Sequence, residues 1–295
     1  MRKTSVYLPE ETKEALHQVS LRWKRSEAQL IREAIDRLVR GADTATAPPL
    51  PPASVRIEGP RLIGVGVGPS APDLITRRAI AVLEGADRVF AASTAPDAIA
   101  RAEAIVRTAA PTVAIDRLPF STTDHADTLD RCFAGAVDAL VAVLDRGQSV
   151  AFITLGDPNV YSTFSELARR VSTRRPAVPI TTVPGIMAFQ ELVAATGTVL
   201  AEGDERIDIA TMGDDAAPLD AALHNAGSTV VLYKGGRHLP EVAIKLDQHQ
   251  RVQGAVIGEL MGMPGGRNGP IADVADRPAS YLATVIVPAC RGERS

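Results

Sequence analysis

A single carboxylate stands directly after a predicted buried strand in the middle of the chain. The largely apolar run from Val150 to Leu155 is typical of a strand in a parallel sheet, and it ends at Gly156, Asp157 and Pro158. Open α/β sheets bind ligands at the carboxyl edge of their strands. Asp157 is therefore expected either to lie near a cationic group of a ligand, or to begin the next helix as a capping carboxylate.

A glycine loop follows another predicted strand nearer the amino terminus. Residues 62–69 read LIGVGVGP. Dinucleotide folds carry GxGxxG at such a place, where the backbone touches a pyrophosphate. Here the spacing is GxGxG, Pro69 has no N–H to offer a phosphate, and the next strand, Arg88–Ala92, lacks an acid for a ribose. No GK[ST] follows, so the loop predicts neither a dinucleotide site nor a P-loop.

Three more loops stand at equivalent strand ends. They are residues 182–188 (TVPGIMA), 211–214 (TMGD) and 233–237 (YKGGR). Because Gly and Pro mark turns in all proteins, each could be a simple turn. Together with the first two loops, however, they form an ordered set that runs GVGVGP, GDPNVYST and VPGI.

The order and spacing of this set resembles the tetrapyrrole (corrin/porphyrin) methylase family over Arg61 to about Pro288. The nearest likeness is to members that methylate precorrin-2, or cobalt-factor II, at carbon 20, on the motifs FITLGDPNVYST, VPGIMAFQELVAATGTVLAEGDE and YLATVIVP. The resemblance implies two α/β lobes with S-adenosyl-L-methionine in the cleft between them, usually in a homodimer. It also implies a role in cobalamin biosynthesis.

Carried over residue by residue, the resemblance implies a set of residues around the methyl donor. These are Pro69, Leu155, Gly156, Asp157, Val160, Ser162, Thr163, Met187, Ala188, Met212, Lys234 and Gly262. Two departures stand out. The usual loop GPGDPE reads GPSAPD here, with Ser70 and Ala71 in place of Gly and Asp. The strand end Ala91-Ala92 lacks the Asp that uroporphyrinogen-type members carry, so the base proposed for that branch is missing.

The chemistry of such a site is mainly positioning, because methyl transfer is an in-line displacement that needs the reacting atoms held in line. The acceptor ring bears many carboxylates, so Lys234, Arg237 and Arg267 are expected to bind it, although each could be a solvated surface charge. A proton must also leave the ring. His125, Tyr161 and Glu259 are conceivable acceptors, as is the ring itself, and no catalytic residue is assigned.

The elements that must position these residues alternate along the chain from about residue 61. Apolar, strand-like runs are separated by predicted helices, which indicates an α/β fold with mostly parallel strands. We expect one lobe over residues 61–184 and a second over residues 185–295. The predicted helices include Asp73–Glu84, Ala126–Asp145, Tyr161–Ser172, Ile186–Thr196 and Leu239–Lys245.

The first 42 residues resemble a different family, the ribbon-helix-helix proteins. Residues 3–8 alternate as a short strand, two amphipathic helices follow, and Ser26 is expected to cap the second. The resemblance implies a dimer that reads DNA through Lys3, Ser5 and Tyr7, with Arg25 and Ser26 near a phosphate. The alternative is a module that only dimerises. Residues 43–60, rich in proline, are expected to be a linker.

Composition is typical of a soluble globular protein. The chain of 295 residues is 45% hydrophobic, and its first 40 residues carry nine basic and six acidic side chains in a protein of net charge −3. It has no signal-peptide core, no apolar run near the roughly 18 residues of a membrane span, and two cysteines without metal-ligand spacing. A cytoplasmic enzyme without a metal is expected. A DNA-binding regulator that uses the methylase domain as a sensor is the rival hypothesis.

Overall fold

The computed structural model describes residues 10–23, 26–31, 57–94, 99–121, 126–212, 216–263, 265–274 and 276–291. The chain divides into two compact units, residues 1–53 and 54–295, and each is described by itself. Within the described stretches we find no helix of the length and apolar character that a membrane crossing requires.

The first unit contains helix α1, Glu10–Trp23, and a second helical stretch at residues 27–31. Ser26 caps that stretch, as the sequence predicted. Its Oγ accepts a hydrogen bond from the Gln29 N–H at 3.3 Å, and its own N–H donates to the Gln29 side chain at 3.1 Å. The structure therefore describes the first expected helix and the capped start of the second.

The other expected parts of that module lie outside the described residues. They include the strand of residues 3–8, with Lys3, Ser5 and Tyr7, and also Arg25 and the linker as far as residue 56. The ribbon-helix-helix module is accordingly not established by the structure.

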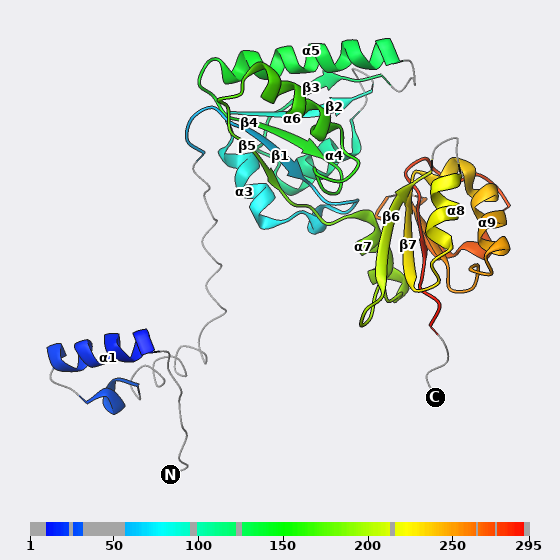
Figure 1. The fold of residues 1–295 in the computed structure, drawn as a ribbon. Helices are drawn as coiled ribbons and strands as arrows, with labels where there is room; N and C mark the ends of the chain where they lie inside the picture. Colours follow the sequence, from blue (N-terminus) through cyan, green and yellow to red (C-terminus); the bar gives the residue numbers. More distant parts are fainter. Residues whose placement is uncertain are drawn as a thin grey trace. The chain divides into compact units, whose positions relative to one another are not determined.

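The second unit begins with a parallel five-stranded sheet in the order β3-β2-β4-β1-β5 (Figure 1). We call this sheet and its helices the first lobe. The strands are β1 Leu62–Gly66, β2 Arg88–Ser93, β3 Ile115–Pro119, β4 Val150–Thr154 and β5 Ile180–Val183. The helices are η1 Pro72–Leu74, α3 Arg77–Gly85, α4 Arg101–Ala109, α5 Ala126–Leu144 and α6 Thr163–Arg174.

Helices cover both faces of this sheet, and this fixes where a ligand can bind. Side chains of α3 and α4 pack with Ile63 and Val65 on one face, and those of α5 and α6 pack with Leu62 and Phe152 on the other. The chain thus leaves β1 toward one face and leaves the neighbouring β4 toward the opposite face. Such a switch point opens a crevice at the carboxyl ends of the two strands.

The second lobe is a mixed five-stranded sheet in the order β6-β7-β10-β8-β9. Only β6 and β7 pair in parallel, so the expectation of parallel strands holds throughout the first lobe but not here. The strands are β6 Arg206–Thr211, β7 Ser228–Tyr233, β8 Val256–Glu259, β9 Arg267–Pro270 and β10 Thr284–Val287. The helices are α7 Ala188–Thr196, α8 Ala217–Leu223, η2 Gly235–His238, α9 Leu239–Gln248 and η3 Ile271–Asp273.

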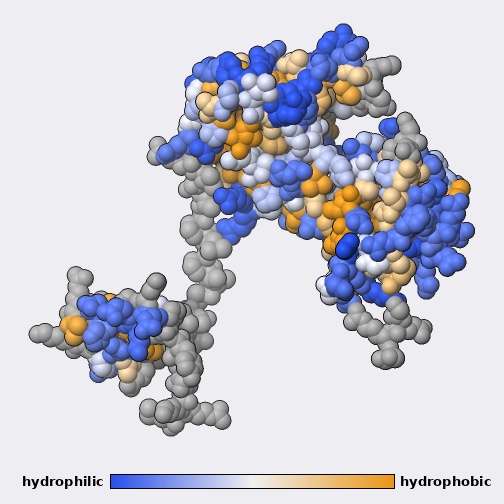
Figure 2. Space-filling view, in the orientation of Figure 1, coloured by the Kyte–Doolittle hydropathy of each residue, from blue (hydrophilic) through white to orange (hydrophobic). Residues whose placement is uncertain are grey.

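Helix α7 covers one face of the second sheet, and α8 and α9 cover the other. The outer surface over α8 and α9 is largely hydrophilic in Figure 2, whereas apolar side chains gather at the surface near α7 and β6. Two of these apolar residues, Val199 and Ile207, are 46% and 40% exposed.

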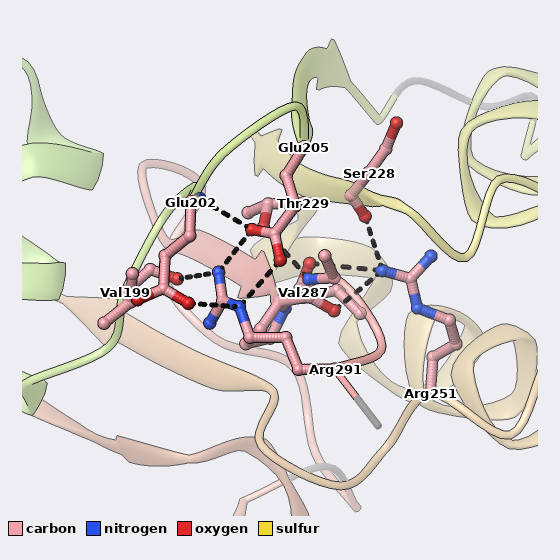
Figure 3. A network of polar contacts seen from close by, with 10 residues as sticks. Val199, Glu202, Glu205, Ser228, Thr229, Arg251, Val287 and Arg291 are labelled. Carbon is pink, nitrogen blue, oxygen red and sulfur yellow. Dashed lines mark hydrogen bonds and ion pairs between the residues drawn. The ribbon is translucent and has the colours of Figure 1, made fainter. Parts of the chain in front are cut away.

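Two arginines hold the end of the last strand of the second lobe (Figure 3). Arg251 is 3% exposed and donates to five main-chain carbonyl groups, at 2.7 Å for Ser228 and 2.8 Å for Pro288. Arg291 forms two hydrogen bonds with Glu205, at 2.7 and 2.9 Å, and a third with the Val199 carbonyl. The carbonyl groups at this end therefore depend on side chains for their hydrogen bonds.

Candidate functional site

A cavity of about 210 Å³ lies at the switch point between β1 and β4. The first lobe lines it with the loops that follow these two strands. The second lobe lines it with the start of α7 and with the segments after β7 and β8. The crevice that the strand order predicts is therefore a real pocket, and both lobes contribute to it.

Three glycines pack together at the floor of the pocket, and one of them, Gly156, lines the cavity itself. A Cβ atom added to Gly66 would lie 2.7 Å from the Gly185 nitrogen, and one added to Gly185 would overlap the Gly156 carbonyl oxygen. The Gly156 N–H also donates to the Gly68 carbonyl at 2.9 Å, which ties the loop after β4 to the loop after β1. No side chain fits at this junction, so its shape is set by the backbone alone.

Asp157 uses its carboxylate to hold the main chain of this floor. One oxygen accepts from the Asn159 N–H at 2.8 Å, and the other accepts from the Gly185 N–H at 3.2 Å. The following helix is capped by Ser162, whose Oγ accepts from the Phe164 N–H at 3.1 Å. The expectation that Asp157 caps this helix is thus wrong, because the chain makes a turn before the helix begins.

An aromatic contact joins the two lobes at one side of the pocket. The Tyr161 hydroxyl donates to the Ile209 carbonyl on β6 at 3.0 Å, and its ring meets Tyr233 edge-on with centroids 6.2 Å apart. Burial raises the pKa of the Tyr233 phenol to about 12, so this phenol stays protonated at neutral pH. Since Tyr161 already donates its proton, neither phenol is poised to accept one.

Three pocket residues that are not glycine have left-handed backbone conformations. Their φ angles are +48° for Tyr161, +61° for Lys234 and +49° for Leu260. Such conformations cost roughly 1–3 kcal/mol each and concentrate at functional sites. The strain occurs on both sides of this cavity, at Tyr161 of the first lobe and at Lys234 and Leu260 of the second, and it marks the cavity as a functional site.

Ten of the twelve residues expected around the donor line the cavity. They are Pro69, Leu155, Gly156, Asp157, Val160, Ser162, Thr163, Met187, Ala188 and Lys234. Met212 is instead 4% exposed in the apolar core of the second lobe. Gly262 packs against Ser70 and is flanked by Met261 and Met263, which do line the cavity.

Of the three basic residues expected to meet the acceptor, only Lys234 lines the cavity. Arg237 stacks on the Tyr281 ring at 4.7 Å, outside the lining. Arg267 pairs with Glu259 at 2.5 Å, since the two residues face each other across the β8–β9 hairpin.

Neither Glu259 nor His125 is placed by the structure as a proton acceptor in the cavity. The second oxygen of Glu259 accepts from the Ser280 N–H at 2.6 Å, so this carboxylate is engaged on both sides and anchors the segment that carries Leu282 into the lining. His125 lies outside the described residues.

The lining also contains residues that no expectation from the sequence covered, among them Ser70, Arg101, Glu191 and Tyr233. Two of these had a usable signal. Glu191 stands one helical turn beyond Ala188, Arg101 opens the helix after β2, and β2 ends at the same sheet edge as β1. In the described part of the chain, no cluster of three His, Cys, Asp or Glu residues is placed to hold a metal ion.

The fold and the pocket define a two-lobed α/β protein with a cavity lined by both lobes. The sequence of residues 61–273 matches the family of Tetrapyrrole (Corrin/Porphyrin) Methylases. The chain belongs to this family.

The curated relatives and solved structures agree with this assignment. A precorrin-2 C(20)-methyltransferase of Sinorhizobium sp is 29% identical over 77% of this chain and 95% of its own length. A cobalt-precorrin-2 C(20)-methyltransferase of Salmonella typhimurium is 28% identical, with the same two coverages. The structure of a cobalt precorrin-4 methyltransferase, CbiF, is similar in fold, with a TM-score of 0.60, 19% identity, and coverage of 77% of this chain and 94% of that one.

Proposed function

We propose that the protein transfers a methyl group from S-adenosyl-L-methionine to carbon 20 of precorrin-2, in cobalamin biosynthesis in the cytoplasm. The observation that carries the proposal is a switch-point pocket lined by ten of the twelve residues implied for the donor. It is supported by two relatives named as C(20)-methyltransferases, each matched over 95% of its length. One is named for the metal-free ring and the other for the cobalt ring, so the metal state of the acceptor is a question for experiment.

The residues of the pocket fit the proposed donor. When bound, S-adenosyl-L-methionine supplies a methyl group on a positively charged sulfur. The glycine floor presents main-chain atoms without side chains, and Asp157 adds a carboxylate to the lining, which suits a cation. Leu155, Gly156 and the Met187–Ala188 turn would hold the donor, while Asp157 keeps the floor in shape.

The acceptor would meet the charged side chains at the rim. Lys234 from the second lobe and Arg101 from the first both line the cavity, and no ion pair of either is found among the described residues. A ring with several carboxylates could bridge them with charge-assisted hydrogen bonds. We therefore propose Lys234 and Arg101 as acceptor-binding residues, in place of Arg267, whose guanidinium is paired with Glu259.

The decisive experiment supplies the purified protein with the donor and either metal-free or cobalt-loaded precorrin-2. The expected products are S-adenosylhomocysteine and a ring with one added methyl group at carbon 20, identified by mass spectrometry and NMR. The relative rates of methylation of the two rings show whether the metal-free or the cobalt-loaded ring is the preferred acceptor. If neither ring is methylated while donor binding is measurable by calorimetry, the proposed function is wrong.

We also propose that residues 1–42 form a ribbon-helix-helix module that pairs two chains into a homodimer and contacts DNA. The capped second helix supports this, as does the hydrogen bond between His17 and Glu27, which joins the two helical stretches at 2.9 Å. Fluorescence anisotropy with a duplex from the gene's own upstream region tests it. Binding should weaken as salt rises and fall further in a Lys3→Ala variant. A dimer with no such binding would leave dimerisation as the module's role.

A further inference from the structure

A second hydrogen bond joins the two lobes at the pocket. The Ser70 hydroxyl, in the loop after β1, donates to the Glu191 carboxylate. Glu191 lies in the first turns of α7, and this helix is packed on the second sheet through Phe189 and Leu192. Both Ser70 and Glu191 line the cavity, so the bond joins one wall of the pocket to the other.

Ser70 also touches a third element. Gly262, in the loop between β8 and β9, has a φ of +67°, and a Cβ atom added there would lie 2.7 Å from the Ser70 Oγ. Its neighbours Met261 and Met263 line the cavity. The loop after β1, helix α7 and the β8–β9 loop therefore meet at one serine side chain, and each of them forms part of the pocket wall.

The carboxylate in this contact depends on the serine. Glu191 Oε2 is buried and has no hydrogen-bond partner among the described residues, whereas the other oxygen accepts from Ser70. Removing the hydroxyl would leave both oxygens without a donor while the lobes are together. A buried charged group left unpaired costs more than the loss of one ordinary hydrogen bond. The two walls would then lose the bond that joins them, and their spacing would no longer be held.

We propose that Ser70 and Glu191 are a positioning pair that holds the two lobes at the spacing the methyl donor requires. The proposal rests on the proposed function, since it takes S-adenosyl-L-methionine as the ligand. Glu191 acts through Ser70 and the wall that they join, not by accepting the proton that leaves the ring.

The test is a double-mutant cycle on donor affinity, measured by calorimetry on the full chain. Ser70→Ala should weaken the donor about tenfold, because it leaves the charge unpaired. Glu191→Ala should weaken it only about threefold, since the charge leaves with the bond. The double variant should match Glu191→Ala and so bind more tightly than Ser70→Ala. Ser70→Thr, which keeps the hydroxyl, should stay within about twofold of wild type.

A serine and a carboxylate at the opposite edge of the sheet provide the matched control. The Ser149 hydroxyl donates to Asp87 at 2.7 Å, at the amino end of β4. Ser149→Ala should lower the melting temperature without changing donor affinity.

Several outcomes would overturn the proposal. They are unchanged affinity in Ser70→Ala, additive losses in the double variant, and equal effects of Ser70→Ala and Ser149→Ala. A Glu191→Gln variant that binds donor and ring normally but loses turnover would make Glu191 a base instead. Failure of the wild-type chain to bind the donor is a different result, because it counts against the proposed function itself.

Discussion

The two walls of the pocket differ in the atoms that form them, which are mainly main-chain atoms in one wall and mainly side-chain atoms in the other. The first lobe and the turn before α7 contribute main chain, in which Gly66 and Gly185 have no room for a Cβ atom beside the Gly156 carbonyl oxygen. The second lobe contributes side chains, chiefly Tyr233, Lys234 and the methionines of the β8–β9 loop. A wall of main chain has one shape, which follows from the strand order. A wall of side chains can change shape with single substitutions.

The supports behind the two walls differ in one respect. In both lobes the central strands are paired on both edges and covered by helices on both faces. In the second lobe the carboxyl end of β10 depends on hydrogen bonds from Arg251 and Arg291. We infer that the first lobe fixes the donor site through backbone geometry, and that the second lobe is free to adapt to the acceptor.

Breaking the main-chain wall should have the largest effect. Gly185→Ala places a Cβ atom 2.9 Å from the Gly66 main chain and on the Gly156 carbonyl oxygen, so the floor must shift. Donor affinity should fall, and turnover should fall on the order of 100-fold, as expected for a displacement of about 1 Å. Calorimetry and steady-state kinetics measure these two losses, and circular dichroism checks folding. Gly135→Ala is the control, because a Cβ atom there meets nothing within 4 Å. Equal affinities in both variants would contradict the comparison.

Removing the arginine that supports the second lobe should have the next largest effect, and this effect is on the stability of the fold. Arg251→Met removes the donor for five carbonyl groups in a buried site, and the expected loss is roughly 3 kcal/mol in the free energy of unfolding. Urea denaturation measures it. Arg291→Gln, at a more exposed site, should cost less. If Arg251→Met were as stable as wild type, the lobe would not depend on side chains as described.

Changing the side-chain wall should affect the acceptor and spare the donor. Lys234→Gln removes a cation from the lining and is expected to raise KM for the ring about tenfold, with donor affinity unchanged. Steady-state kinetics and calorimetry separate the two effects. Arg237→Gln is the control, since this guanidinium stacks on Tyr281 outside the lining. A loss of donor affinity in Lys234→Gln would contradict the proposal that the first wall binds the donor and the second wall binds the acceptor.

The smallest effect is expected at an exposed ion pair of the first lobe. Hydrogen bonds from Arg169, and then from Arg170, lower the pKa of Glu166 from 4.5 to about 2. The stabilisation from this group is therefore present above pH 4.5 and is lost as the pH falls toward 2. Glu166→Gln should cost less than about 1 kcal/mol at pH 7, because the pair is partly solvated. Urea midpoints at pH 7 and pH 3 measure whether the difference shrinks with acid.

Much of the first wall could be predicted because its signals are local. An apolar run that ends at Gly156 and Pro158 locates a strand end, and the order of parallel strands then places that end beside Pro69. The first residue of a helix was predicted less accurately than the end of a strand. The helix predicted from Tyr161 begins at Thr163, because the Ser162 side chain supplies the cap.

The second wall was harder to predict because it depends on strand register. Arg267 and Glu259 face each other only through the pairing of β8 with β9, and no local pattern reveals that the arginine is already paired. Met212 follows β6 as a loop residue would, yet its side chain turns into the core. The role of Asp157 in holding Gly185 also depends on a contact 28 residues away.

The left-handed residues of the pocket have a consequence for protein engineering. Glycine at Tyr161, Lys234 or Leu260 would relieve the backbone there, so a screen for heat resistance should favour it. The same replacements would remove an aromatic bridge, a cation and an apolar wall from the pocket. A thermostable variant of this protein is best sought elsewhere in the chain, because at these three positions resistance to heat and the capacity to bind ligands are opposed.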